Sequence, residues 1–210
     1  MSVLDFLSPS RAVAIGDVRP LARSSMDRHQ REAGATFVER DGWLVPTSIP
    51  GESEHLSAVG IADLSHLGKL EVSGSAPGTD QPVSGAGVVA VHRISPRRTL
   101  VLCETAQTTA LHESLAEQGR VLDVSAALGV LALVGPEAQT LIRRLTHLHE
   151  LPSSGELAHV NTVHLLARSD GGVTLVFPQE FGHYLWEVVV DRAEPLGGGP
   201  VGVDAIGGAA

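Results

Sequence analysis

The sequence has 210 residues and a mass of 21.9 kDa, which suits one domain or two small intertwined ones and needs no disulfide to bury a core. Hydrophobic residues make up 43% and charged residues 19%, a composition typical of a folded chain. The net charge is −9 and Lys69 is the only lysine, which argues against a basic face for nucleic acid. The single cysteine, Cys103, excludes an internal disulfide and a multi-cysteine zinc site.

Two further observations bear on location. No apolar run approaches the roughly 18 residues that a membrane-spanning helix needs. The opening residues MSVLDFLSPSR lack the basic and apolar regions of a secretory signal. We therefore expect a soluble cytoplasmic protein that binds neither nucleic acid nor a membrane.

The first half of the chain alternates short helices with strands. Residues 1–20 have weak patterning and are expected to form an arm. Ser24 or Ser25 can cap a helix that runs through Arg31 and closes at Gly34. The following segments are predicted as a hairpin turning at Asp41–Gly42, a second helix, and two strands: 35–45, 52–59, 61–64 and 67–72.

Residues 73–87 consist of glycine, serine, proline and small polar residues, so we predict a flexible loop. Beyond it, strands are predicted at 88–94, 99–103, 121–124, 129–134, 160–167 and 173–177. Helices are predicted at 105–118, 136–145 and from Pro178 onward, the last with an apolar stripe of Phe181, Tyr184, Leu185 and Val188. The glycine-rich end from Leu196 is expected to fray. The alternation predicts an α+β fold with helices packed on mainly antiparallel sheets.

Several kinds of site have no support in the sequence. It contains no GxGxxG following a strand, no GxxxxGK[ST] and no GxSxG. The densest histidine group is His147, His149, His159 and His164, which we interpret as solvated surface histidines, and no metal site is expected. Cys103 lies at the end of an apolar strand beside Glu104, whose charge would raise the thiol pKa, so a buried structural cysteine is favoured.

The informative residues are an ordered set of motifs. SMDRH (25–29), GA (34–35), GWLVP (42–46), Glu54 and VGIADLSHLGKLEVSG (59–74) occur in this order. TLVLCETA (99–106), VLDVS (121–125), ALVGPEA (132–138) and PVGVDA (200–205) follow. This set resembles the glycine-cleavage T-protein family, the tetrahydrofolate-dependent aminomethyltransferases. The resemblance implies the family's folate-binding domain over residues 21–206, as two intertwined small subdomains with a tail at 207–210 and without the family's C-terminal barrel.

The departures from the family pattern concern its chemistry. In the family, a longer segment follows the VSG motif and ends in an Asp–Asp pair that includes the catalytic carboxylate. Here residues 73–87 replace that segment, and the paired acids align with Gly87 and Val88, neither of which can relay a proton. Another acid of the family falls near Val173 and Thr174. The resemblance therefore implies no catalytic residue in this chain.

The resemblance still implies candidate folate contacts. Leu67 takes the place of a folate-contacting methionine, Glu104 that of a folate-contacting asparagine, and Leu102 lies on the same strand as Glu104. Glu104 could hold a pterin or amine, or could be an ordinary acid at the end of a strand. The remaining motif residues are Trp43, Asp63, Ser65, His66 and Gly68. Among them, Trp43 is expected to attach the hairpin to the core, and His66 to hydrogen-bond a turn.

The chain also resembles the small gamma subunit of heterotetrameric sarcosine oxidases, through residues 123–136 and 181–186. This implies an accessory subunit of a folate- or flavin-linked one-carbon enzyme, in a hetero-oligomer with a larger flavin amine oxidase or T-protein-like chain. Tetrahydrofolate is a possible ligand, and no covalently bound cofactor is expected. Two alternatives remain open: a transferase that uses Glu104 or a partner's residue, and a scaffold without a ligand.

Overall fold

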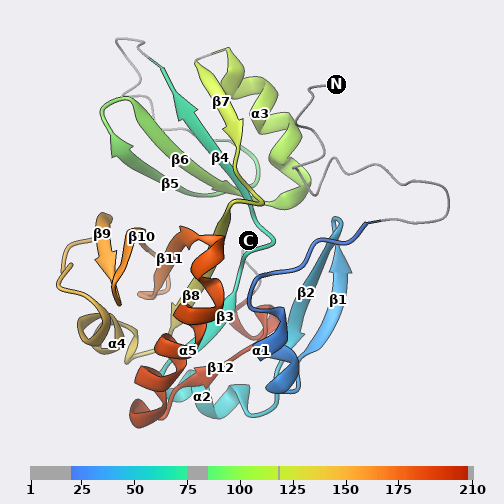
Figure 1. Ribbon diagram of the computed structural model, residues 1–210. Helices are drawn as coiled ribbons and strands as arrows, with labels where there is room; N and C mark the ends of the chain where they lie inside the picture. The colour runs from blue at the N-terminus through green and yellow to red at the C-terminus, as the bar shows by residue number, and fades with distance from the viewer. Residues whose placement is uncertain (1–19, 75–84, 118, 208–210) are drawn as a thin grey trace.

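The computed structural model describes residues 20–74, 85–117 and 119–207 (Figure 1). The expected arm, most of the expected loop at 73–87 and most of the tail lie outside these residues. The described chain begins with α1 (Asp27–Glu32), the hairpin β1 (Thr36–Arg40) and β2 (Trp43–Ser48), α2 (Glu52–Ala58) and β3 (Gly60–Asp63). These elements confirm the predicted order of helix, hairpin, helix and strand.

A four-stranded antiparallel sheet forms the upper part of the molecule in Figure 1. It contains β4 (Gly68–Ser73), β5 (Val88–Ser95), β6 (Arg98–Cys103) and β7 (Arg120–Asp123), in the order β5-β6-β4-β7. A 3-10 turn (Thr105–Gln107) leads into α3 (Thr108–Ala116). Leu115 of this helix packs against Leu70 of β4 and Val101 of β6.

A six-stranded sheet in the order β12-β3-β8-β11-β10-β9 forms the lower part. Its remaining strands are β8 (Leu128–Val134), β9 (Ser153–Leu157), β10 (Val160–Ala167), β11 (Val173–Pro178) and β12 (Gly199–Pro200). The helices α4 (Ala138–Leu145) and α5 (Gly182–Ala193) bury their apolar faces in the core of this part. None of the sheets formed by the described residues closes into a barrel.

The two parts are intertwined because the upper one is an insertion in the lower one. β3 and β8 are antiparallel neighbours, with Ile61 opposite Leu133, although β4 to β7 lie between them in the chain. The chain therefore crosses between the sheets twice, at 64–67 and at 124–127. This arrangement confirms the predicted α+β class.

The predicted apolar stripe of the last helix is wrong by about one position. Phe181 and Tyr184 are each 40% exposed, whereas the side chains facing the core are those of Leu185, Trp186, Val189 and Ala193. A 3-10 turn (Gln179–Phe181) precedes α5, so the helical phase begins at Gly182 rather than at Pro178. In the same way, α3 begins only after a 3-10 turn, and Gln118 at its expected end lies outside the described residues.

The expectation of a frayed end from Leu196 is also wrong. β12 pairs in parallel with β3, and Val201 and Val203 are 0% and 1% exposed. A Cβ at Gly202 would clash with the carbonyl oxygen of Thr47, so glycine at this position permits close packing. A further strand, β9, forms between α4 and β10, where no strand was predicted. No helix in the described part of the chain is long and apolar enough to cross a membrane.

Candidate functional site

Glu104 directly follows β6. The last residue of β6, Cys103, pairs with Gly68 of β4 on one side and with Val88 of β5 on the other. The backbone N–H of Glu104 donates to the carbonyl of Gly87 at 2.8 Å. A Cβ built on Gly87 would lie 3.3 Å from Oε2 of Glu104. The carboxylate of Glu104 thus occupies space directly beside the position that aligns with the family's paired acids.

Leu67 and Leu102 lie together in a buried apolar cluster that also contains Trp43. Their exposed fractions are 2% and 0%, and that of Trp43 is 5%. The placement of Trp43 confirms that it attaches the β1–β2 hairpin to the core. The structure therefore places the two candidate leucines in the core and Glu104, half-buried, at the end of the strand that carries Leu102.

The acidic motif residue, Asp63, connects α1 to the turn between the sheets. Its side chain is 2% exposed and accepts hydrogen bonds from the Gln30 amide and from the backbone N–H of Ser65. The hydroxyl of Ser65 in turn accepts from the backbone N–H of Val130 at 3.1 Å. Both motif side chains thus help to hold the first crossing in place.

His66 and Gly68 have contacts that serve packing. The carbonyl of His66 accepts a hydrogen bond from the hydroxyl of Thr105, which links the turn between β3 and β4 to the 3-10 turn before α3. Burial lowers the pKa of His66 to about 4, so its ring is neutral near pH 7. A Cβ at Gly68 would clash with Thr108 and lie 2.7 Å from the Cys103 sulfur. Cys103 is fully buried and its thiol pKa is raised by burial, as expected for a structural cysteine.

The only lysine, Lys69, joins the two crossings. Its side chain is 0% exposed, and Nζ donates to the carbonyls of Ser65 at 2.6 Å, Ser125 at 2.7 Å and Leu128 at 3.1 Å. Nζ also lies 5.3 Å from the centre of the Trp43 ring. Ser65 belongs to the first crossing, Ser125 belongs to the second, and Leu128 directly follows the second. One side chain therefore holds both connections between the sheets.

Sequence reasoning missed this role of Lys69, although a signal was present. A single lysine within the apolar run IADLSHLGKL, in a chain whose other basic residues are arginines, is an unusual placement. Burial lowers the Lys69 pKa to about 7, while the charges of Asp63 and Asp123 oppose that shift. Three carbonyl acceptors match the three protons of an ammonium group.

A second polar connection between the sheets involves two histidines. Ser154 of β9 lies 2.7 Å from Nε2 of His92 on β5 and 2.7 Å from Nδ1 of His164 on β10. The rings are 4% and 5% exposed, and burial lowers the pKa of both, to about 4 for His164. The interpretation of His164 as a solvated surface histidine is therefore wrong, whereas the His159 side chain is 91% exposed.

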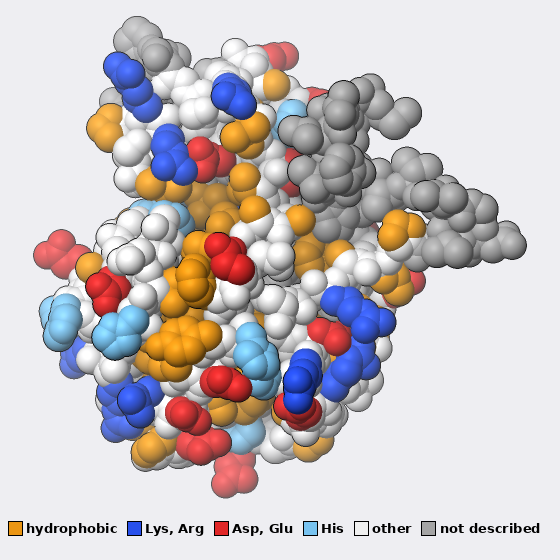
Figure 2. Space-filling view, in the orientation of Figure 1, with side chains coloured by type: hydrophobic (Ala, Val, Ile, Leu, Met, Phe, Trp, Pro, Cys, Tyr) orange, Lys and Arg blue, Asp and Glu red, His pale blue; other side chains and the backbone are white. Residues whose placement is uncertain are grey.

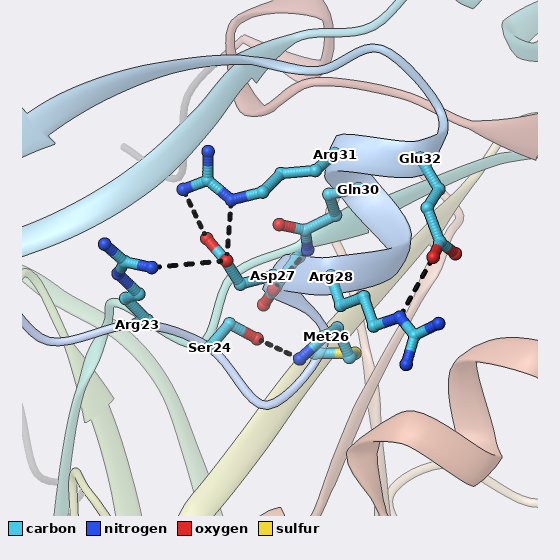
Figure 3. A network of polar contacts seen from close by, with 9 residues as sticks. Arg23, Ser24, Met26, Asp27, Arg28, Gln30, Arg31 and Glu32 are labelled. Carbon is cyan, nitrogen blue, oxygen red and sulfur yellow. Dashed lines mark hydrogen bonds and ion pairs between the residues drawn. The ribbon is translucent and has the colours of Figure 1, made fainter.

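Ion pairs on the surface of α1 connect its side chains with one another and with Arg23 just before the helix (Figure 3). Asp27 accepts from Arg31 at 2.8 Å and pairs with Arg23 at 3.9 Å, and Arg28 donates to Glu32 at 2.9 Å (Figure 3). Each pair joins residues four apart, the spacing at which side chains meet on a helix.

Two hollows of the described surface lie away from the candidate residues. One of about 460 Å³ lies between α4, α5 and the β9–β10 turn, with the side chains of Arg143, Tyr184 and Arg192 in its lining. Another of about 600 Å³ lies beside α2 and is lined by residues 48–54 with Gly34 and Thr36. Neither hollow is lined by Leu67, Leu102 or Glu104.

The fold and motifs together define a T-protein-like class, and comparison with solved structures agrees. Aminomethyltransferase T of the glycine cleavage system from Bartonella henselae superposes with a TM-score of 0.68 over 88% of this chain and 60% of that chain, at 18% identity. A chain of heterotetrameric sarcosine oxidase from Corynebacterium sp. U-96 gives 0.59 over 84% and 96%, also at 18% identity. The chain therefore has the T-protein, folate-binding-domain-like fold.

Sequence comparison points the same way. The chain is 42% identical over 96 residues to the aminomethyltransferase of Mycobacterium tuberculosis (strain ATCC 25618 / H37Rv), covering 43% of this chain and 26% of that protein. It is 25% identical over 235 residues to that of Desulforamulus reducens, covering 90% and 63%. The chain thus spans less than two thirds of these relatives. No protein-family model matches it.

Proposed function

We propose that this chain is a degenerate T-protein-like subunit that assists a folate- or flavin-linked one-carbon enzyme and lacks a catalytic acid of its own. The observation that carries the proposal is the pair Gly87 and Val88 at the positions aligned with the family's acids. Aminomethyl transfer requires a carboxylate held against the reacting amine, because a proton has to be moved there. Neither residue offers such a group.

The burial of the candidate leucines supports the same proposal. A pterin ring needs an accessible apolar surface with a few convergent polar groups. Leu67 and Leu102 are almost completely covered by their own core, so they offer a ligand little surface. Among the described residues, none donates a hydrogen bond that would orient the Glu104 side chain.

The size and fold of a known subunit support a partner. This chain aligns with 96% of a chain from a heterotetrameric sarcosine oxidase, so a unit of similar extent occurs in a multi-subunit enzyme. We propose by analogy that this chain assembles with a larger flavin amine oxidase or T-protein-like chain. That chain would supply the catalytic groups and most of any folate site.

One observation favours a second candidate function. Because the carboxylate of Glu104 lies 3.3 Å from the Cβ position of Gly87, it could substitute for the aligned acid in a tetrahydrofolate-dependent transferase. In that case, the acid would come from β6 instead of β5.

A titration with tetrahydrofolate separates the two candidates. Binding is followed by isothermal calorimetry and by fluorescence of Trp43 and Trp186, for the native chain, Glu104→Gln and Glu113→Gln. The control Glu113 is an exposed acid on α3. The accessory proposal predicts no saturable binding by any of the three. Saturable binding that Glu104→Gln weakens and Glu113→Gln leaves unchanged would favour the transferase.

A further inference from the structure

Three potential metal ligands from two helices converge on the lower surface. His183 and Glu187 are four residues apart on α5 and therefore share one face, and His29 reaches them from α1. Oε1 of Glu187 lies 3.8 Å from Nε2 of His29 and 3.6 Å from Nε2 of His183. The ligand atoms of all three residues lie within 4.8 Å of one another. Figure 2 shows pale-blue histidine side chains next to red acidic ones over the region between α1 and α5.

One of these ligand atoms is buried without a partner. Nε2 of His29 is inaccessible to solvent and makes no hydrogen bond in the structure. The His29 side chain is only 12% exposed, whereas those of His183 and Glu187 are each 54% exposed. A buried ring nitrogen without a partner is costly. A bound cation would satisfy it through the nitrogen lone pair.

The surroundings of His29 resemble the usual environment of a metal-bound histidine. A histidine ligand commonly directs its other ring nitrogen to a carboxylate, which fixes its tautomer and orientation. Nδ1 of His29 lies 3.8 Å from Oε2 of Glu32. Glu32 is in turn held by Arg28, as Figure 3 shows. The carboxylate is therefore available on the side of the ring opposite Glu187.

From this geometry we propose that His29, His183 and Glu187 form a binding site for a divalent transition metal, with Zn²⁺ as the best match. Two imidazoles and one carboxylate are a known three-residue zinc ligand set that leaves a fourth position for water. Metal–ligand bonds near 2.0–2.2 Å require the ligand atoms to approach one another more closely than they do here. His183 can make that adjustment because its stacked ring, 4.1 Å from that of His29, is half-exposed.

Occupation of this site would tie α1 to α5. α1 also carries Gln30, which holds Asp63 at the crossing between the sheets. A metal at this position would therefore stabilise the N-terminal helix and the motif residue that depends on it. The inference does not depend on the proposed accessory function, since it uses none of the residues aligned with the folate site.

The test is a calorimetric titration of the full chain with Zn²⁺, and with Mg²⁺ as a hard cation that prefers oxygen ligands. Native protein should bind one Zn²⁺ at this site and ignore Mg²⁺. Removing a residue that only hydrogen-bonds a metal ligand already lowers metal affinity by about 10–100-fold. His183→Gln and Glu187→Gln each remove a ligand itself and should therefore weaken binding at least about tenfold. Co²⁺ should quench the fluorescence of Trp186, whose ring lies 6.5 Å from that of His29, and His183→Gln should shift that quenching to at least about tenfold higher Co²⁺ concentration.

The matched control is His159→Gln. His159 also faces a carboxylate, Glu156 at 3.3 Å, but no third potential ligand lies beside it among the described residues. This variant should bind Zn²⁺ as the native protein does. The inference is overturned if no saturable Zn²⁺ binding occurs, or if His159→Gln weakens it as much as His183→Gln does. Both target side chains are half-exposed, and unchanged circular dichroism establishes that the variants are folded.

Discussion

Lys69 combines complete burial with three carbonyl acceptors from two chain segments that are far apart in sequence. Replacing it with methionine keeps most of the volume but leaves the carbonyls of Ser65, Ser125 and Leu128 without their donor. Leaving a buried hydrogen-bond acceptor without its donor typically costs about 1–3 kcal/mol. We expect Lys69→Met to lower the free energy of unfolding by about 3 kcal/mol at pH 7, measured by urea denaturation. A variant as stable as the native chain would contradict the role of Lys69 at the crossings.

The same residue predicts a dependence of stability on pH. The pKa of Lys69 is about 7 in the folded chain, against an ordinary value of 10.5. Between these values the unfolded chain binds more protons, so the free energy of unfolding rises with pH, by at most about 1.4 kcal/mol per unit. The difference in stability between native protein and Lys69→Met should therefore widen from pH 7 to pH 9. A constant difference would mean that the folded pKa of Lys69 is not depressed.

His164 has the same sign of shift in a lower range. Its pKa is about 4 in the folded protein and 6.5 ordinarily, because burial disfavours the charged ring. The unfolded chain binds more protons between these values, so stability is lost as pH falls from about 6.5 towards 4. His164→Asn should remove about 2 kcal/mol of that acid-induced loss, while exposed His147→Asn should leave it intact. If both variants lost the same stability between pH 6.5 and pH 4, His164 would be excluded as the source of the acid-induced loss.

At the residue level, the sequence predicted the burial of residues whose placement depends on their neighbours along the chain. Trp43 and Cys103 follow apolar patterns and lie where expected. The roles of Lys69 and His92 were not foreseen, because Ser125 lies 56 residues from Lys69 and Ser154 lies 62 residues from His92 in the sequence. Only the folded sheets bring those partners together. The cluster of His29, His183 and Glu187 was not foreseen either, because His29 is far from the other two residues in the sequence.

At the level of elements, hairpins and amphipathic helices were predictable, and their ends and phases were less so. The turns at Asp41–Gly42 and the short helices follow from glycine and capping signals. The 3-10 turn before α5 shifts the helical phase, and no propensity in the sequence announces it. β12 has two residues and is stabilised by tertiary packing of Val201 and Val203. A glycine-rich composition alone therefore misled the prediction for this segment.

The packing of the C-terminal segment can be tested at Gly202. Its φ of −76° suits any residue, so the cost of alanine there comes from the clash with the carbonyl of Thr47. Gly202→Ala should lower the free energy of unfolding by about 1–3 kcal/mol, the usual cost of overpacking. In Gly207→Ala, a left-handed residue in open space, only backbone strain of about 1 kcal/mol is expected. A cost for Gly202→Ala below that for Gly207→Ala would indicate a loosely held segment.

At the scale of the whole molecule, an inserted four-stranded unit is attached to a six-stranded sheet at two places. Lys69 holds the crossings, and His92 with Ser154 and His164 holds the far side of the insertion. The α+β class and the resemblance to the T-protein were readable from ordered motifs spread over the chain. The topology of an insertion was not readable, since it depends on β3 pairing with a strand that follows four intervening strands.

The central proposal is that this chain acts within a larger one-carbon enzyme. The most direct measurement is the mass and cofactor content of the tagged chain isolated from the organism that encodes it, by light scattering with absorbance spectroscopy and mass spectrometry. We predict a hetero-oligomer in stable proportion with a larger chain that either carries flavin or resembles the T-protein. Isolation as a lone chain that transfers a one-carbon unit from tetrahydrofolate, with an activity abolished by Glu104→Gln, would contradict the proposal.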